Sequence, residues 1–262
     1  MRASSLLLLS LVVAGDCGSG TPTRDTGLND ANGQDSGNQD AARPDAPPID
    51  APRRDVGTKP TCGTLLAVLR DCRADHPDFE GNLGTDRGIV EDMLGADRKP
   101  VYAVDTSPTT SNADNFDEWY RDVEGVNQRF EVPMPLTEGP AGVFVFESDA
   151  FFPLDGMGWD EEIDGHNFHF TTEIHASFQY RGGETFTFRG DDDVWVFVND
   201  RLALDLGGVH GAQEATIDFD AMATELGIEV GRPYALEVFH AERHTTQSNF
   251  RVETSIDCFI LE

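Results

Sequence analysis

Three adjacent aspartates interrupt the most strongly alternating stretch of the chain, residues 186–211. Before them phenylalanine alternates with polar residues, and after them residues 194–198 are apolar on both faces of an extended chain. The pattern predicts a strand, an acidic turn and a central sandwich strand that is buried on both faces. Asp191, Asp192 and Asp193 repel one another unless water, hydrogen-bond donors or a cation offset their charge. Because Ca²⁺ binds about six to eight oxygen ligands, it is the cation we expect at this turn.

Alternation elsewhere predicts further short strands. They are expected at residues 65–70, 143–146, 166–180, 215–219, 234–240 and 250–256, with edge segments at 88–90 and 100–103. Phe116, Trp119 and Tyr120 have helical spacing and predict a short helix, whose aromatic side chains we expect in the core and not in a sugar-binding surface. Residues 221–226 allow one or two more helical turns. Many short strands and few helices imply an all-β fold, an antiparallel β-sandwich.

The charge of the chain argues against one class of partner. With 19 basic and 48 acidic residues, the formal net charge is −29, so we expect no binding to a nucleic-acid backbone. From Cys62 onward there are 13 basic and 40 acidic residues, a net charge of −27, and the negative charge therefore belongs to the folded part. Such a surface suits a secreted protein that meets divalent cations, and it equally suits simple solubility.

The first 17 residues resemble an export signal. A single basic residue precedes the apolar run 6–13, which is too short to span a bilayer as a helix. Cys17 then follows in a sequence similar to the lipobox of bacterial lipoproteins, although Asp16 stands where Gly or Ala is expected. We expect lipidation of Cys17 and anchoring to a membrane through the lipid, with ordinary cleavage after Ala14 or Gly15 as the alternative. Export by either route permits disulfides.

Residues 18–61 form an expected tether. The segment is rich in Asp, Gly and Pro and has too few large apolar residues to offset the entropy of ordering it. Aspartate recurs at every fifth position from Asp25 to Asp55, a period that matches neither a strand nor a helix face. We therefore expect a disordered spacer, roughly 35 to 40 Å from end to end as a flexible coil, before a folded domain at residues 62–262.

Five separated motifs resemble the fibro-slime domain family. They are RDCRADHPDFE at 70–80, FDEWYRDVEGVN at 116–127, HNFHFTTEIH at 166–175, GGETFTFRGDDDVWVFVNDRLALDLGGVHG at 182–211 and FHAERHTTQSNFRVETS at 239–255. The resemblance covers residues 62–262. The fibro-slime family is in turn similar to the β-sandwich modules named after the insert domain of anthrax protective antigen, the PA-fourteen group. The resemblance therefore implies a β-sandwich of that type for residues 62–262.

The resemblance also implies a set of metal ligands. In sugar-binding adhesins of the wider group, an Asp-Asp pair binds Ca²⁺ together with a later Asn and loop carbonyls, and the ion coordinates sugar hydroxyls. By position, Asp191 and Asp192 are the pair and Asn249 is the later ligand. Asp193 stands where the wider group commonly has Gly, and it adds a charge beside the expected site.

Several loop residues are further candidates. Asp193, His210 and His244 are possible binding-loop residues, and Glu242 and Arg243 beside His244 would allow a polar site near the aspartate pair. The remaining histidines of the folded part show no HExxH or other tight ligand spacing. For those we favour structural hydrogen bonds over zinc binding or catalysis.

Cysteine usage predicts one disulfide in the folded domain. Cys62, Cys72 and Cys258 cannot all pair within the chain. Cys62 opens the domain and Cys258 closes it, and first and last strands are often neighbours in such sandwiches, so this pair is favoured, with Cys72–Cys258 left open. Cys72 stands where the family more often has an aromatic residue, which favours a buried free thiol.

Together these features favour an exported, surface-tethered binding module that uses Ca²⁺ to recognise a glycan or an extracellular-matrix component. A structural matrix or assembly protein with a purely stabilising cation is the alternative. A polysaccharide-degrading enzyme is less favoured, because pairs of carboxylates mean little in a chain this acidic. The sequence also has no GxSxG elbow and no phosphate-cradling glycine loop.

Overall fold

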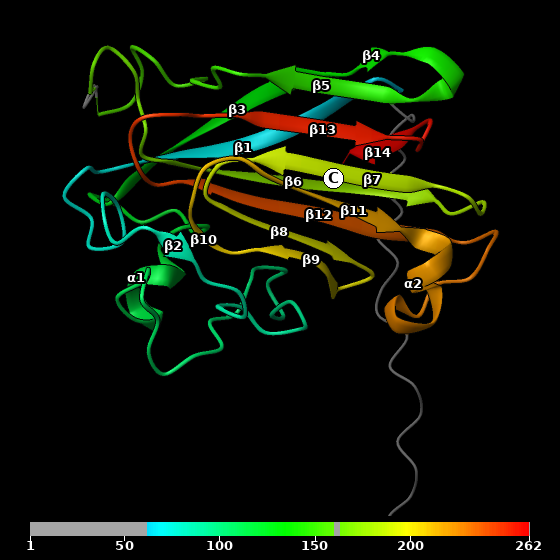
Figure 1. Cartoon of the computed structure of the whole chain (residues 1–262), viewed down its shortest axis with the longest axis horizontal. Helices are drawn as coiled ribbons and strands as arrows, with labels where there is room; N and C mark the ends of the chain where they lie inside the picture. The colour runs from blue at the N-terminus through cyan, green and yellow to red at the C-terminus, as the bar shows by residue number, and fades with distance from the viewer. Residues whose placement is uncertain (1–61, 160–162, 262) are drawn as a thin grey trace, which may run out of the picture. The chain divides into compact units, whose positions relative to one another are not determined.

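Residues 62–159 and 163–261 are described by the computed structural model of the chain, and they form an antiparallel β-sandwich (Figure 1). The larger sheet contains β1 (Thr64–Cys72), β3 (Asn127–Pro135), β6 (Phe170–Gln179), β8 (Asp193–Val198), β9 (Arg201–Leu206), β12 (Pro233–Glu242) and β14 (Phe259–Leu261). Its strands lie in the order β3, β1, β6, β12, β8, β9, and β14 pairs with the last residues of β6. The predicted export signal, Cys17 and the tether lie outside the described residues.

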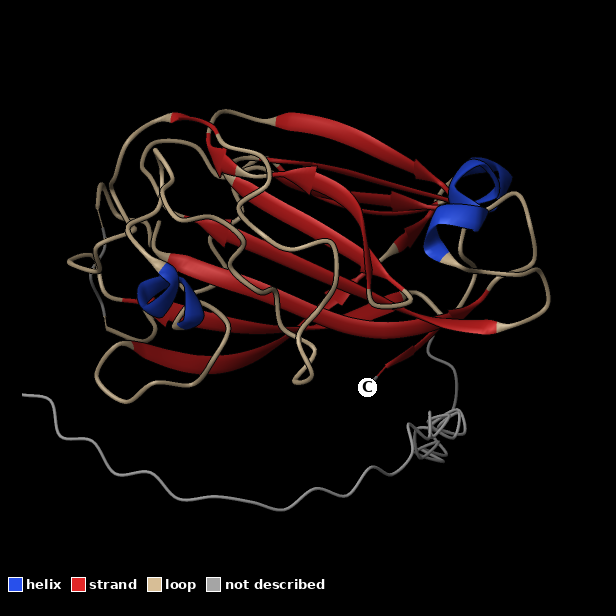
Figure 2. Ribbon diagram, turned by 90° about the horizontal axis from the view of Figure 1, so that it is seen from below, coloured by secondary structure: helices blue, strands red, loops and turns tan. Residues whose placement is uncertain are grey.

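The smaller sheet packs on one face of the larger one. It contains β4 (Thr137–Glu138), β5 (Phe144–Ser148), β7 (Thr185–Gly190), β11 (Gln213–Asp218) and β13 (Phe250–Thr254), in the order β11, β7, β13, β5, β4. A separate two-stranded ladder joins β2 (Gly84–Thr85) to β10 (Gly208–Val209), and Pro140–Gly142 forms a 3₁₀ turn. Two short helices, α1 (Ala113–Asp117) and α2 (Phe219–Leu226), lie at opposite ends of the sandwich (Figure 2). The predicted all-β sandwich with short helices is confirmed.

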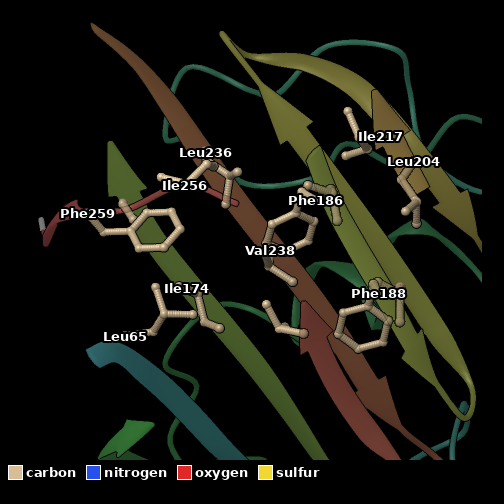
Figure 3. Packing of buried hydrophobic residues seen from close by; sticks show 14 of the residues in the cluster. Leu65, Ile174, Phe186, Phe188, Leu204, Ile217, Leu236, Val238, Ile256 and Phe259 are labelled. Carbon is tan, nitrogen blue, oxygen red and sulfur yellow. The ribbon is translucent and has the colours of Figure 1, made fainter. Parts of the chain in front are cut away.

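Apolar side chains from both sheets form the main core (Figure 3). Phe186 and Phe188 of β7 alternate with polar neighbours, so both point toward the larger sheet, where Ile174 and Val238 lie. All four side chains are fully buried. Burying a side chain of this size contributes about 1.5–3 kcal/mol, so the alternation seen in the sequence is a main source of stability.

The opposite face of the larger sheet carries a second core. Trp195 and Phe197 of β8 point there and meet Trp119 and other aromatic residues of the segment 73–126, which contains α1. β8 is therefore buried on both faces as predicted, although it lies second from the sheet edge and not at the centre. The cover on this face is a loop-rich segment and not a third sheet. The expectation that Phe116, Trp119 and Tyr120 belong to a core is confirmed.

Strand β3 was not expected from the sequence. It contains Pro133 and Pro135, which lack the N–H group that a central strand needs. β3 pairs only with β1 and forms an edge of the sheet, where a missing donor leaves no neighbouring carbonyl unpaired. The two prolines therefore argued against a strand at this place in the sequence, and the edge position of β3 makes the strand possible.

Other boundaries differ by a few residues. The strand expected at 166–180 begins at Phe170, and the helix expected at 116–120 begins earlier, after Asn112. The Asn112 side chain accepts a hydrogen bond from the Asn115 backbone N–H at 2.9 Å, which is the usual capping interaction at a helix start. The described ranges contain no helix long and apolar enough to cross a membrane.

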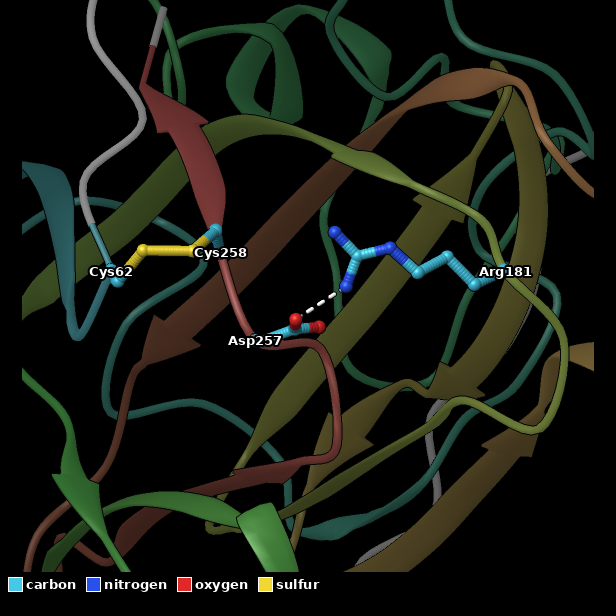
Figure 4. The surroundings of a disulfide bond; sticks show 4 residues. All are labelled: Cys62, Arg181, Asp257 and Cys258. Carbon is cyan, nitrogen blue, oxygen red and sulfur yellow. Dashed lines mark hydrogen bonds and ion pairs between the residues drawn. A yellow bond between two sulfur atoms is a disulfide. The ribbon is translucent and has the colours of Figure 1, made fainter.

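A disulfide joins Cys62 and Cys258, as favoured from the sequence (Figure 4). Cys62 lies two residues before β1 and Cys258 directly precedes β14, and both of these strands pair with β6. An ion pair between Arg181 and Asp257 lies beside it. Cys72 is a free, buried thiol, as expected, and burial raises its pKa. The bridge therefore ties the two ends of the domain to one strand.

Candidate functional site

Loops from four parts of the chain meet at one end of the sandwich, beside the acidic turn between β7 and β8. They enclose a pocket of about 450 Å³. Its lining consists of residues 83–85, Asp191, Asp192, 209–211 and 244–247. Of the residues singled out from the sequence, Asp191, Asp192, His210 and His244 thus share one pocket, whereas Asp193 does not line it.

Asp191 is fixed by Asn249. The Asp191 Oδ2 atom accepts hydrogen bonds from both the backbone N–H and the side-chain amide of Asn249, each at 2.7 Å. The Asp191 backbone N–H donates in turn to the Asn249 carbonyl at 3.3 Å. Asp191 is only 2% exposed, and its second oxygen, Oδ1, is buried without a hydrogen-bond partner. A buried acceptor without a partner is energetically costly, and this oxygen is free to accept a donor or to coordinate a cation.

Asp192 ties three chain segments together. Its Oδ1 atom accepts from the His210 backbone N–H at 3.0 Å and its Oδ2 from the Arg243 backbone N–H at 2.8 Å. The residue has a φ of 51°, in the left-handed region that aspartate tolerates better than most residues. Burial raises its pKa to about 7, against the lowering effect of Arg243 and of the two N–H donors. The negative charge of Asp192 is therefore only partly offset.

Asp193 faces away from the pocket. It is the first residue of β8 and shares the parity of Trp195, so its side chain points to the second core. There its Oδ2 accepts from Arg243 Nε at 2.6 Å, and its Oδ1 accepts from the Gly208 backbone N–H at 2.6 Å. The extra charge at Asp193 is thus paired inside the protein.

Arg243 is a residue whose partner the sequence did not reveal. Its side chain is fully buried, with the guanidinium carbon 4.6 Å from the centroid of the Trp119 ring. Its Nη1 atom donates to the backbone carbonyls of Asp78 at 3.0 Å and of Thr109 at 2.7 Å. Arg243 therefore connects the acidic turn with the segment 73–126.

Glu242 lies behind the pocket as a third acidic group. Both of its carboxyl oxygens are buried without a hydrogen-bond partner. Burial, together with the charges of Asp192 and Asp191, raises its pKa well above the usual range. Glu242 and Arg243 do lie near the aspartate pair, as the sequence allowed, although Arg243 contacts it through its backbone.

The two pocket histidines are already engaged. The His210 ring nitrogens lie 3.1 and 3.0 Å from the carbonyl oxygens of Gly211 and Leu206. His244 lies 3.6 Å from a Glu80 carboxyl oxygen, and the same carboxyl accepts from the Thr245 backbone N–H at 3.0 Å. These contacts fix the positions of the two loops that carry His210 and His244. No group of three or more His, Cys, Asp or Glu side chains converges on a metal position within the described part, so a cation here needs amide or carbonyl oxygens as well.

One wall of the pocket depends on glycine. Gly208 in β10 has a φ of 111°, and a Cβ atom there would lie 2.2 Å from the Gly84 carbonyl oxygen of β2. Only glycine allows these backbones to approach so closely. The ladder places Leu83 at the pocket, where its side chain is 70% exposed, and Thr85, which accepts from Gln213 at 3.0 Å. This wall comes from the segment 73–126.

The fold and the pocket define a β-sandwich domain with a polar pocket among the loops at one end. Residues 153–258 match the PA14 domain family. The chain therefore contains a PA14-type domain, which confirms the relationship indicated by the sequence motifs. The segment that supplies Leu83, Trp119 and the disulfide partner Cys62 lies outside the matched residues.

Similar proteins extend beyond this match. Protein psiD of Dictyostelium discoideum is 41% identical over 217 residues, covering 76% of this chain and 42% of psiD. Protein psiR of the same organism is 37% identical over 200 residues, covering 69% of this chain and 20% of psiR. The chain thus spans between a fifth and about two fifths of the length of these relatives. They are consistent with the fibro-slime resemblance.

Two solved structures are more distant. A PA14 sugar-binding domain from an RTX adhesin has a TM-score of 0.31 and 11% identity, covering 74% of this chain and 90% of that one. The PA14 domain of the MpAFP antifreeze protein has a TM-score of 0.30 and 12% identity, covering 86% of this chain and 93% of that one.

Proposed function

We propose that the domain is an exported binding module that recognises a glycan through a Ca²⁺ ion held at the acidic turn. The observation that supports this proposal is the unpartnered, buried Oδ1 of Asp191, a residue that lines the pocket. The pocket volume of about 450 Å³ lies within the range of roughly 300–1,000 Å³ that is common for ligand sites.

The donor groups fit a hard cation. Asp191 Oδ1 has no partner, and each Asp192 oxygen accepts one N–H and keeps a second lone pair. Asn249 would supply its amide oxygen after a rotation of the amide group that now donates to Asp191. Carboxylate, amide and carbonyl oxygens are the ligands that Ca²⁺ prefers. When bound, the ion would supply positive charge and open coordination positions for ligand hydroxyls.

Electrostatics support a cation in the same place. Asp191 and Asp192 are almost completely buried side by side, and Glu242 lies behind them. Buried carboxylates of like charge are unfavourable unless something offsets them. The nearest guanidinium, that of Arg243, is paired with Asp193 on the other side of the strand. A divalent cation would offset the charge that remains.

One observation favours a second function. Both Asp192 oxygens already hold backbone N–H groups of neighbouring loops, so the turn organises those loops without any outside ligand. This arrangement suits a structural matrix or assembly protein in which a cation only stabilises the fold. The two functions differ in whether a bound ion remains open to a ligand.

The export part of the proposal has its own support. The Cys62–Cys258 disulfide suits an oxidising compartment outside the cytosol. Lipidation of Cys17 would then attach the domain to a membrane through residues 18–61. Metabolic labelling with a radioactive fatty acid tests this step, since label should enter the wild-type protein and be absent from Cys17→Ser.

Thermal melts test the cation. We expect Ca²⁺ at about 100 times its Kd to stabilise the protein by roughly 2.7 kcal/mol, a rise in midpoint of several degrees, and a chelator to reverse it. Asp191→Asn should lose the rise. Asp114→Asn, at an exposed position in α1, is the matched control and should keep it. Equal midpoints with Ca²⁺ and with chelator in the wild type would rule out the ion.

A glycan array probed with and without Ca²⁺ separates the two functions. Binding that requires Ca²⁺ supports recognition through the ion. A midpoint shift with Ca²⁺ but an empty array supports the structural alternative.

A further inference from the structure

We infer that the pocket selects uncharged glycans and rejects glycans that carry a carboxylate or a sulfate. This inference rests on the proposed function and specifies its ligand. It depends on which charged side chains line the pocket and where the nearest basic groups point.

The lining of the pocket contains acidic groups but no lysine or arginine. Asp191 and Asp192 are its charged residues, and the remainder are aliphatic, hydroxyl, amide, histidine or glycine residues. Anionic ligands are commonly held by arginine forks, lysine ammonium groups or helix N-termini. The pocket therefore lacks the side chains that would pair with an acidic sugar.

The nearest basic groups are occupied or outside the pocket. Arg243 belongs to a loop beside the pocket, but its guanidinium is fully buried against Asp193 and Trp119. Arg87 follows the pocket wall by two residues and is not part of the lining. Lys99, the single lysine of residues 62–262, pairs with Glu173. Arg243 and Lys99 are thus paired with carboxylates of the protein, and Arg87 lies outside the lining.

Nearby acids extend the negative field beyond the ion. Glu80 holds Thr245 of one wall, and Asp86 directly follows Thr85 of the other. Even with Asp191 and Asp192 offset by a divalent cation, these carboxylates and the large negative charge of the domain repel an anion that approaches the mouth.

The uncharged surface of the pocket suits the hydroxyls and C–H faces of a neutral sugar. Thr85, Thr246 and Gln247 offer hydroxyl and amide groups, and the exposed Leu83 offers an apolar surface. Each of these groups interacts with a neutral sugar without needing a counter-charge.

Matched glycan pairs test this selectivity. Each pair shares one neutral core and differs by a single sialic acid, uronic acid or sulfate, and binding to the full exported chain is measured with Ca²⁺ present. We expect the neutral member to bind about tenfold more tightly at 10 mM salt and the ratio to fall at 150 mM salt, since screening shortens the reach of the field to about 8 Å.

A lysine substitution in the pocket lining tests whether the missing positive charge causes the selectivity. Gln247→Lys should raise binding of the acidic members severalfold relative to binding of the neutral members. Gln179→Lys is the matched control, because it adds the same charge at an exposed position at the far end of β6. It should not change the ratio.

The outcomes are distinct. Equal or tighter binding of the acidic members by the wild type would overturn this inference and leave the proposed glycan recognition intact. No binding of any member with Ca²⁺ would overturn the proposed function itself.

Discussion

Arg243 donates from Nε to Asp193 Oδ2 across 2.6 Å, and neither side chain is exposed to solvent. The two residues are 50 positions apart in the chain. Because the same guanidinium packs on Trp119, the pair connects the acidic turn to the segment that covers the second core. The turn that bears Asp191 and Asp192 is therefore supported from behind by an internal ion pair.

Removing one partner of this pair should be strongly destabilising. Arg243→Met is expected to lower the free energy of unfolding by about 3–5 kcal/mol, because Asp193 is then left as a buried, unpaired charge. The double variant Arg243→Met/Asp193→Asn should lose less than the sum of the single variants. Urea denaturation of all three measures the coupling. Arg181→Met, in the exposed pair with Asp257, is the control and should lose at most about 1 kcal/mol. Additive losses for Arg243 and Asp193 would contradict the pairing.

Alanine at Gly208 should displace the pocket wall. The new methyl group would meet the Gly84 carbonyl, so we expect a loss of about 1–3 kcal/mol and faster amide exchange at residues 84–86. Gly88→Ala provides the comparison, since Gly88 also has a positive φ of 80° but open space around its Cβ position. It should show backbone strain without the change in exchange. Similar exchange in both variants would mean that contact with Gly84 is unimportant.

The disulfide should contribute far more to stability than the free thiol. The bridge has a sequence separation of 196 residues, for which chain entropy gives up to about 5 kcal/mol. The double variant Cys62→Ala/Cys258→Ala is expected to approach that loss in denaturant titrations. Cys72→Ala should lose about 1 kcal/mol. It should also remove the one free thiol of the domain, which is buried and, in the absence of reductant, reacts with a thiol reagent only after unfolding. A double variant as stable as Cys72→Ala would contradict this expectation.

Stabilisation by Ca²⁺ should grow with pH. Burial raises the Asp192 pKa to about 7, above an unfolded value of about 4, so its stabilising contribution is complete below pH 4 and is lost as pH rises through 7. The raised pKa of Glu242 acts in the same direction. A bound cation offsets the charge that then forms. The Ca²⁺-dependent rise in midpoint should therefore be small at pH 5 and larger at pH 8, and Asp192→Asn should flatten the trend. A rise of constant size across this range would exclude the coupling.

Much of the fold was predictable because alternation reports burial directly. The alternation of Phe186 and Phe188 predicted β7, and the apolar run around Trp195 predicted a strand covered on both faces. The nature of that cover was not predictable, since it depends on how the segment 73–126 folds back over the sheet. β3 was missed because Pro133 and Pro135 are compatible with a strand only at an edge, and edge position is a property of the whole sheet.

The candidate site was predictable in part. Adjacent carboxylates marked Asp191 and Asp192, and the family resemblance pointed to Asn249, which does contact Asp191. The direction of Asp193 was also available, because it shares the parity of Trp195 and so faces away from Asp192. The ion pair between Asp193 and Arg243 was not predictable, since a contact across 50 positions follows only from the strand order.

The position of the disulfide has a mechanical consequence. The pocket lies at the Phe170 end of β6, whereas Cys62 and Cys258 lie near the Phe178 end. Tension applied to the chain just before Cys62 enters the domain at the end away from the pocket. Because the covalent bridge joins Cys62 to the residue before β14, that load reaches both β1 and β14. The loops around Asp191 thus lie at the opposite end of the sandwich from the covalent bridge.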